Sequence, residues 1–205
     1  MTSAGQIWDH RFSEKGWPTD PDPYLVELAE GQPVGRGLDL GAGPGRNSLW
    51  LAQKGWDMTL LDASRVGLDQ ARDAAGALGL TITTVCADLF DWRPEEASFN
   101  LVIVANIHPD QDALVAVLAG AALALRPGGH LYVVGHHVTS LGRQGPPDPD
   151  RLLTPERLRD ALPTELRIEV LAIRDRRGGH GQGANAATAD TVVVAWAIKP
   201  EAPGG

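Results

Sequence analysis

The chain has 205 residues, of which 43% are hydrophobic, enough for one domain with a substantial core. Its net charge is −8, with 18 Lys and Arg against 26 Asp and Glu, which argues against a nucleic-acid or anionic-membrane partner. The single cysteine, Cys86, excludes an internal disulfide and favours a reducing compartment. Because residues 1–10 lack a signal-peptide pattern and the apolar run 113–125 is too short to span a bilayer, we expect a cytoplasmic protein.

The N-terminal residues 1–33 are expected to form a cap. They carry Trp8, Phe12 and Trp17, and Trp8, Arg11 and Phe12 have the i, i+3, i+4 spacing of one helix face. The Asp-Pro-Asp-Pro run at 20–23 then predicts a capped short helix over 24–30.

Residues 37–52, GLDLGAGPGRNSLWLA, predict a strand, a glycine turn and a helix. Gly41, Gly43 and Gly45 allow positive φ angles and close approach of a ligand, and the helix start adds free N–H groups. The G-x-G-x-G spacing differs from the dinucleotide fingerprint G-x-G-x-x-G, because Arg46 stands where the third glycine belongs. The loop therefore predicts a nucleotide-containing cofactor and argues against NAD.

Strand and helix patterns alternate along the rest of the chain. Strand-like runs at 57–62, 81–86, 99–105 and 130–135 are separated by helical patterns such as 64–78 and 110–125. Runs at 166–173 and 191–198 are expected to form an antiparallel hairpin, with Arg174, Arg176 and Arg177 in its solvated loop. A Gly- and Pro-rich segment, 138–153, is long enough for a functional lid.

These patterns predict an α/β fold. We expect a single doubly wound, Rossmann-like domain with a mostly parallel seven-stranded sheet, an antiparallel C-terminal hairpin and helices on both faces. Within it, residues 1–33 form the cap, 36–136 the cofactor-binding core, and 137–205 the lid loop and hairpin.

Polar groups follow several of the predicted parallel strands, at the sheet edge where ligands of such folds bind. Asp62 lies about 20 residues beyond Gly43, the spacing at which a carboxylate reaches ribose hydroxyls. Asp88 follows the third strand and could accept a hydrogen bond from an exocyclic amine such as that of adenine. Asn106-Ile-His108 follows the fourth strand.

The segments GLDLGAGPG, TLLDAS, CADLFDW and LALRPGGHLYVV resemble the successive motifs of class I S-adenosylmethionine-dependent methyltransferases, over about residues 36–136. WDHRF, GWP and NIH resemble more narrowly the thiopurine- and tellurite-type methyltransferases, which act on small nucleophiles, often soft sulfur, selenium or tellurium. The resemblance implies methyl transfer from S-adenosylmethionine to the S, Se, Te, O or N atom of a small-molecule acceptor, with S-adenosylhomocysteine as product. Asn100 departs from the family, which usually has an acidic residue at the start of the fourth strand.

The resemblance also implies roles for individual residues. The glycine loop would pack on the methionine portion, with Asp39 near its amino group and Arg11 reaching its carboxylate. Ala105 would contact the sulfonium side. The expected cofactor contacts are Trp8, Arg11, Asp39, Gly41, Ala42, Gly43, Asn47, Asp62, Ala63, Asp88, Leu89 and Ala105.

His108 is the candidate catalytic residue, as a general base or a positioning group for the acceptor; the alternative is a histidine whose ring is satisfied by backbone groups. Trp17, His136 and Arg143 are expected on the substrate side, Trp17 as part of the lid and Arg143 as a partner for an anionic acceptor. Adjacent strand residues such as His136 and His137 point to opposite faces, so no metal site is predicted.

Other functions stay open. An NAD(P)-dependent oxidoreductase is opposed by the missing third glycine and by the lack of a Tyr-x-x-x-Lys pattern. A non-catalytic cofactor-binding protein remains an alternative, because a fold does not determine a function. A DNA adenine methyltransferase is disfavoured, because the fourth strand is followed by Asn-Ile-His-Pro and not by Asn-Pro-Pro and an aromatic residue.

Overall fold

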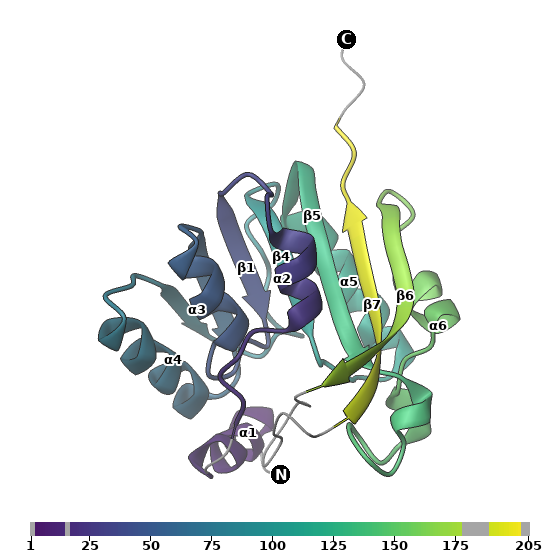
Figure 1. Ribbon diagram of the computed structural model, residues 1–205, viewed down its shortest axis with the longest axis horizontal. Helices are drawn as coiled ribbons and strands as arrows, with labels where there is room; N and C mark the ends of the chain where they lie inside the picture. Colours follow the sequence, from purple (N-terminus) through teal and green to yellow (C-terminus); the bar gives the residue numbers. More distant parts are fainter. Residues whose placement is uncertain (1–2, 15–16, 178–188, 202–205) are drawn as a thin grey trace.

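The computed structural model describes residues 3–14, 17–177 and 189–201 and contains a seven-stranded sheet (Figure 1). The strand order is β3-β2-β1-β4-β5-β7-β6. Strands β1 to β5 pair in parallel, whereas β7 runs antiparallel to both β5 and β6. The predicted α/β fold with its C-terminal hairpin is confirmed. The strands are β1 (Arg36–Leu40), β2 (Asp57–Asp62), β3 (Thr83–Cys86), β4 (Phe99–Ala105), β5 (Leu125–His136), β6 (Arg167–Arg177) and β7 (Ala189–Ile198).

Helices cover both faces of the sheet. Apolar residues of α2, α3 and α4 pack in one core cluster, and those of α5 and α6 pack in a second cluster on the other face. In β4, Leu101 and Ile103 belong to the first cluster and Val102 and Val104 to the second, as the alternation of a strand buried on both faces requires. The helices are α1 (Ala4–Ser13), α2 (Pro23–Ala29), α3 (Arg46–Gln53), α4 (Arg65–Ala77), α5 (Gln111–Ala124) and α6 (Pro155–Ala161).

Polar side chains begin several of these helices. Ser64, Asp110 and Thr154 each accept a hydrogen bond from a backbone N–H of the first turn, of α4, α5 and α6 respectively. Such caps satisfy donors that a helix start leaves open. None of the described helices combines the length and apolar composition that a membrane crossing requires.

Helix α1 lies beyond the carboxyl end of β1 (Figure 1) and is anchored there by polar and apolar contacts. Asp9 accepts hydrogen bonds from the Ser64 hydroxyl at 2.6 Å and from the Val66 N–H at 3.0 Å, at the start of α4. The Phe12 ring occupies the space that a side chain on Gly67 would need, because a Cβ there would lie 2.9 Å from Phe12 Cδ2. α1 is therefore docked on the edge where the parallel strands end.

The C-terminal hairpin differs from the prediction in one important respect. β6 continues to Arg177 and β7 begins at Ala189, so Arg174, Arg176 and Arg177 belong to a strand. The expectation of a solvated loop is wrong for Arg176, which is 2% exposed. Buried carboxylates pair with the Arg176 guanidinium in this strand, as described below.

Two glycines provide a matched test of the backbone. Gly45 has φ 80°, and a Cβ there would lie 2.9 Å from Leu60 Cδ2 and 3.0 Å from Ala71 Cβ. We expect Gly45→Ala to destabilise the fold by about 2–4 kcal/mol through backbone strain and overpacking. Gly76, inside α4, has no neighbouring atom within 4 Å of the point that a Cβ would occupy. Gly76→Ala should stabilise by about 0.5–1 kcal/mol. Urea unfolding of both variants measures this, and equal effects would contradict it.

Candidate functional site

A cavity opens between α1 and the carboxyl ends of β1, β2, β3 and β4, the edge at which doubly wound sheets bind ligands. Its lining combines the glycine loop, two carboxylates that follow strands, and aromatic side chains from the N-terminal segment. Many of the residues that the sequence predicts for a cofactor or acceptor meet here. Those that line the cavity are Trp8, Trp17, Gly41, Gly43, Asp62, Ala63, Asp88, Leu89 and Ala105.

The glycine loop has the backbone conformation that its residues predict. Gly41, Gly43 and Gly45 have φ angles of 74°, 54° and 80°. The N–H groups of Gly41 and Ala42 donate to the Leu61 carbonyl at 2.8 and 3.1 Å, which ties the loop to the end of β2. With no side chains at Gly41 and Gly43, the main chain itself forms this wall of the cavity.

Asp62 is the carboxylate at the end of β2, and it is 8% exposed. Its Oδ2 atom accepts from the Gly43 N–H at 2.8 Å, and its Oδ1 atom accepts from the Ser64 N–H at 2.7 Å. Burial raises the pKa of Asp62, although the two hydrogen bonds oppose that effect. Each oxygen keeps a further lone pair, so this carboxylate can accept two hydroxyl donors from a ligand such as a ribose.

Asp39, on β1, lies behind the loop and is not among the described residues that line the cavity. It is 2% exposed, and its Oδ2 atom accepts from the Ser48 hydroxyl at 2.7 Å. Burial raises the pKa of Asp39 to about 7, against the lowering effect of the Ser48 hydrogen bond. This carboxyl group is therefore only partly ionised near neutral pH.

Aromatic rings form the wall that faces the loop. Trp8 stacks on Phe12 with ring centroids 5.4 Å apart, and Trp17 meets Phe12 edge-on at 4.9 Å. All three line the cavity, and so does Phe90, which follows Asp88 and Leu89 in the chain. Such a wall suits flat or apolar groups.

Besides Asp39, three of the predicted cofactor contacts do not line the cavity. Arg11 is exposed, with its guanidinium 4.8 Å from the ring centroid of Trp8. Asn47 is buried, and its Oδ1 atom accepts from the Asp22 N–H at 2.9 Å, so it positions the start of α2. Ala42 packs against an apolar core cluster. Among the described residues that line the cavity, the cation is Arg46, at the start of α3.

His108 also lies outside the described lining, and both of its ring nitrogens have backbone neighbours. Nδ1 is 3.1 Å from the Arg151 carbonyl, and Nε2 is 3.4 Å from the backbone N of His136. Since a carbonyl only accepts, Nδ1 carries the proton and Nε2 accepts. Burial and the neighbouring His136 lower the pKa of His108 to about 3, so the ring stays neutral.

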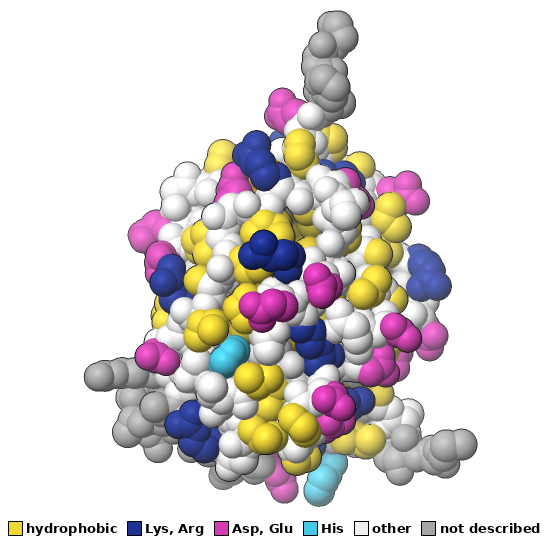
Figure 2. Space-filling view, turned by 90° about the vertical axis from the view of Figure 1, so that its right-hand side faces the viewer, with side chains coloured by type: hydrophobic (Ala, Val, Ile, Leu, Met, Phe, Trp, Pro, Cys, Tyr) yellow, Lys and Arg dark blue, Asp and Glu magenta, His cyan; other side chains and the backbone are white. Residues whose placement is uncertain are grey.

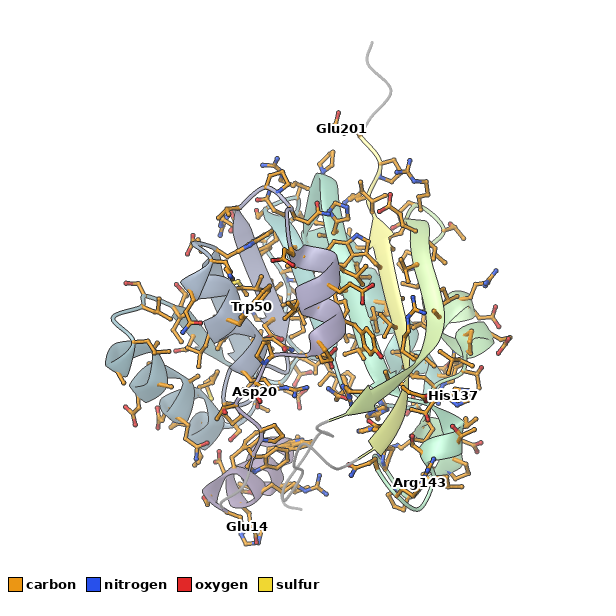
Figure 3. The ribbon with its side chains drawn as sticks, viewed as in Figure 1. Glu14, Asp20, Trp50, His137, Arg143 and Glu201 are labelled. Carbon is orange, nitrogen blue, oxygen red and sulfur yellow. The ribbon has the colours of Figure 1, made fainter. Side chains whose placement is uncertain are left out.

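The other expected acceptor residues lie on the hairpin side. His136 is 2% exposed, with Nδ1 2.9 Å from Oδ2 of Asp190. Arg143 is exposed and donates to the Thr139 carbonyl at 2.7 Å. In Figure 3 it lies at the lower right, on the opposite side of the view from Glu14, which follows α1. Residues 138–153, two short 3₁₀ turns (Val138–Ser140 and Pro149–Arg151) among them, do not contribute to the cavity lining described above.

A buried charge cluster, which sequence reasoning missed, lies beside the cavity. The Arg176 guanidinium donates to Asp22 at 2.5 Å, to Asp190 at 2.7 Å and to the Oδ1 atom of Asn106 at 3.2 Å. Burial alone would raise the pKa of Asp190, but the contacts with His136 and Arg176 lower it to about 2. Asp22 also accepts from the Tyr132 hydroxyl at 2.8 Å. The sequence shows Asn106 after a strand and Arg176 within an Arg-Asp-Arg run. It does not show that they meet, because the partners in this cluster are distant in the chain.

Comparison with known proteins shows which class of protein this site resembles. Residues 38–129, from β1 into β5, match a family model described as a methyltransferase domain. This part of the chain is similar to methyltransferase domains, and the match supports S-adenosylmethionine as its cofactor.

One curated relative is the ribosomal RNA small subunit methyltransferase C of Alcanivorax borkumensis. It is 28% identical over 120 residues, which is 55% of this chain but only 36% of that protein. The chain thus spans about a third of the length of this relative.

Solved structures share the fold over most of the chain. One, from work on the conversion of a disulfide bond into a thioacetal group during echinomycin biosynthesis, has a TM-score of 0.82 and 24% identity and covers 98% of this chain and 94% of its own. The N-methyltransferase NodS of Bradyrhizobium japonicum, in complex with S-adenosylhomocysteine, has a TM-score of 0.69 and 19% identity. The match covers 96% of this chain and 98% of NodS. TehB from Haemophilus influenzae has a TM-score of 0.68 and 17% identity, and the match covers 86% of this chain and 61% of TehB.

The buried Asp39 leads to a prediction about pH. The folded state holds the Asp39 proton up to about pH 7, whereas the unfolded chain releases it near the ordinary value of 3.8. Stability relative to Asp39→Asn should therefore be greatest at acid pH and fall by up to about 1.4 kcal/mol per pH unit as pH rises from about 4 to about 7. Urea unfolding of both proteins across this range measures the difference, and a difference independent of pH would contradict the assignment.

Proposed function

We propose that the protein is an S-adenosylmethionine-dependent methyltransferase that acts on a small-molecule acceptor, nearest in type to the thiopurine- and tellurite-type enzymes. The observation that carries the proposal is the cavity under α1, where the glycine loop, Asp62 and Asp88 face an aromatic wall. The structure from work on echinomycin biosynthesis covers 98% of this chain, so the similarity in fold extends over nearly all of the given sequence.

The residues present fit the cofactor. Asp62 has a free lone pair on each oxygen for the ribose hydroxyls. Asp88 and Leu89 line the part of the cavity beyond β3 and would hold the adenine, with Ala63 on its other side. Ala105, at the end of β4, would lie by the sulfonium.

The methionine portion would lie along the glycine loop, with Asp39 and Arg11 as its charged neighbours. The cofactor's ammonium group would stabilise the ionised form of Asp39, since a nearby cation favours the carboxylate. Arg11 rests on the ring of Trp8, which lines the cavity, so a rotation of its side chain would bring it towards the methionine carboxylate.

The bound cofactor supplies an activated methyl group on a positively charged sulfur. For an in-line displacement, the protein has to hold the acceptor atom close to this methyl group, at about 3–3.5 Å, and aligned with the bond that breaks. The rings of Trp8, Phe12 and Trp17 would exclude water from this approach. The reaction in this proposal depends on proximity.

A soft sulfur acceptor suits this site best. His108 is neutral and has both ring nitrogens engaged, so it is poorly placed to act as a general base. A thiolate has no proton to lose and needs no base. The relative from work on conversion of a disulfide bond into a thioacetal group points to the same kind of acceptor. We therefore propose that His108 holds the 138–153 loop against β5 through the Arg151 carbonyl.

An RNA acceptor is the second candidate, because the curated relative is a ribosomal RNA methyltransferase. The match covers only 36% of that protein, and the net charge of this chain is −8. On the face seen in Figure 2, Lys and Arg side chains are interspersed with Asp and Glu. This pattern lacks the concentrated positive charge that favours RNA.

The first prediction concerns the cofactor. Asp62→Ala should weaken binding of S-adenosylhomocysteine by about ten- to a hundredfold, because charge-accepted hydrogen bonds contribute about 1.5–3 kcal/mol. Isothermal calorimetry measures the affinity, and thermal unfolding verifies that the variant is folded. Asp57→Ala, at the exposed opposite end of β2, is the matched control and should bind as the wild type does. Equal binding by Asp62→Ala would contradict the assignment of Asp62 as a cofactor contact. Absence of S-adenosylhomocysteine binding by the wild type would contradict the proposed function.

The second concerns the acceptor. With S-adenosylmethionine present, small thiols should be methylated, and a ribosomal RNA transcript should not. The rate should rise with pH only as the thiol itself ionises, near about pH 8.5 for an ordinary thiol. A titration near pH 6.5 that His108→Gln abolishes would instead restore His108 as a base. Methylation of the transcript alone would favour the RNA candidate.

A further inference from the structure

The charge cluster beside the cavity contains hydrogen-bond donors without acceptors. Within the described part of the chain, the buried side-chain nitrogens with no hydrogen-bond partner include Arg46 Nη2, Asn106 Nδ2 and Arg176 Nε. A buried donor left unpaired costs about 1–3 kcal/mol, and more when the group is charged. The nitrogens of Arg46 and Asn106 are closed to solvent, but both residues line the cavity, so a small shift of either side chain would let a ligand supply the missing acceptor.

The orientation of the Asn106 amide follows from its neighbour. Arg176 has only donors, so the amide atom that it contacts at 3.2 Å has to be the oxygen. The amide nitrogen is thereby left as the unpaired donor. Asn106 also has φ 58°, a left-handed conformation that Asn tolerates better than most residues. The network holds one neutral donor in a defined direction at the end of β4.

Arg46 supplies the second donor and a positive charge. Its side chain is 13% exposed, and one nitrogen donates to the Asp20 carbonyl at 3.3 Å. Its Nη2 atom is 3.8 Å from Oδ2 of Asp22, too far for a hydrogen bond. Asp22 is already engaged by Arg176 and by the Tyr132 hydroxyl. Burial lowers the pKa of Arg46, an effect that a bound anion would reverse.

The strand order places Asn106 on the side of the cavity away from Asp62 and Asp88, and Arg46 follows the glycine loop between the two sides. Asp62 and Asp88, proposed for the cofactor, follow β2 and β3 on one side of β1. Asn106 follows β4, on the other side of β1, and its partner Arg176 comes from β6 at the far edge. A group held between Arg46 and Asn106 would therefore lie beyond the methionine end of the cofactor.

We propose that Arg46 and Asn106 form a carboxylate-binding subsite for the methyl acceptor, with Arg176 holding Asn106 in place. The acceptor is then a small molecule that carries a carboxylate at a distance from its nucleophilic atom. The guanidinium provides the charge-assisted hydrogen bond, and the amide provides a second donor to the same group. The inference rests on the proposed function, because it takes the cavity to be the site of methyl transfer.

The test uses the full chain saturated with S-adenosylhomocysteine and four probes at constant ionic strength: acetate, benzoate and their neutral counterparts acetamide and benzamide. The readout is the side-chain amide signal of Asn106 in ¹⁵N–¹H nuclear magnetic resonance, assigned by its loss in the near-isosteric variant Asn106→Asp. We expect saturable shifts with the carboxylates and at most weak shifts with the amides. Arg46→Met should weaken the binding of the carboxylates by at least about tenfold, because it removes one charged hydrogen bond.

Two controls keep the result interpretable. Arg36→Met removes an exposed arginine at the opposite end of the sheet and should leave the shifts unchanged. If Arg46→Met does not fold, Arg46→Lys makes the same comparison, because an ammonium keeps the charge and loses the planar donor pair; an intermediate affinity is then expected.

Three outcomes would overturn the proposal. The proposed subsite is contradicted if the protein does not bind carboxylates more tightly than amides, or if Arg46→Met binds carboxylates as the wild type does. In the third outcome, Arg46→Met weakens the binding of S-adenosylhomocysteine by tenfold or more. The same variant binds 5′-methylthioadenosine, which lacks the amino-acid portion, as the wild type does. That result would assign the donors to the cofactor's own carboxylate. Failure of the wild type to bind S-adenosylhomocysteine is a separate result, which contradicts the proposed function.

Discussion

The burial of one guanidinium, that of Arg176, constrains how the distant parts of this chain meet. Removing such a charge from water costs several kcal/mol unless its partners are well placed. Here Asp22 precedes α2, Asn106 follows β4 and Asp190 lies in β7, and Arg176 contacts all three. The N-terminal segment, the centre of the sheet and the C-terminal hairpin are therefore held together at one point, beside the cavity.

The two sides of the cavity are built by different means. On the side of β2 and β3, the surface consists of the main chain of the glycine loop and of the Asp62 carboxylate, which two backbone N–H groups hold in place. On the side of β4, the surface depends on side chains whose positions are set by the Arg176 contacts. A common methyl donor and a particular acceptor would call for this division, because the first site can be shared by many enzymes and the second cannot.

The histidines illustrate how burial changes the chemistry available to a side chain. His108 stacks on His136 with ring centroids 5.1 Å apart, and a positive charge on one ring disfavours a positive charge on the other. Asp190 provides a negative charge next to His136, while His108 has only backbone neighbours at its nitrogens. His108 thus contributes hydrogen bonds that connect β4, β5 and the following loop.

Sequence alone determined the strand–helix alternation, the glycine loop and the carboxylates that follow β2 and β3, because these features depend on residues close together in the chain. It therefore predicted the fold, and eight of the residues that it predicts as cofactor contacts line the cavity: Trp8, Gly41, Gly43, Asp62, Ala63, Asp88, Leu89 and Ala105. Only the tertiary structure decided that Arg176 is buried, that His108 is engaged by backbone groups, and that Arg46 and Asn106 line the cavity. The physical reason is that charge burial depends on which partners arrive from elsewhere in the chain, and no local pattern encodes the meeting of Asp22, Asn106 and Asp190.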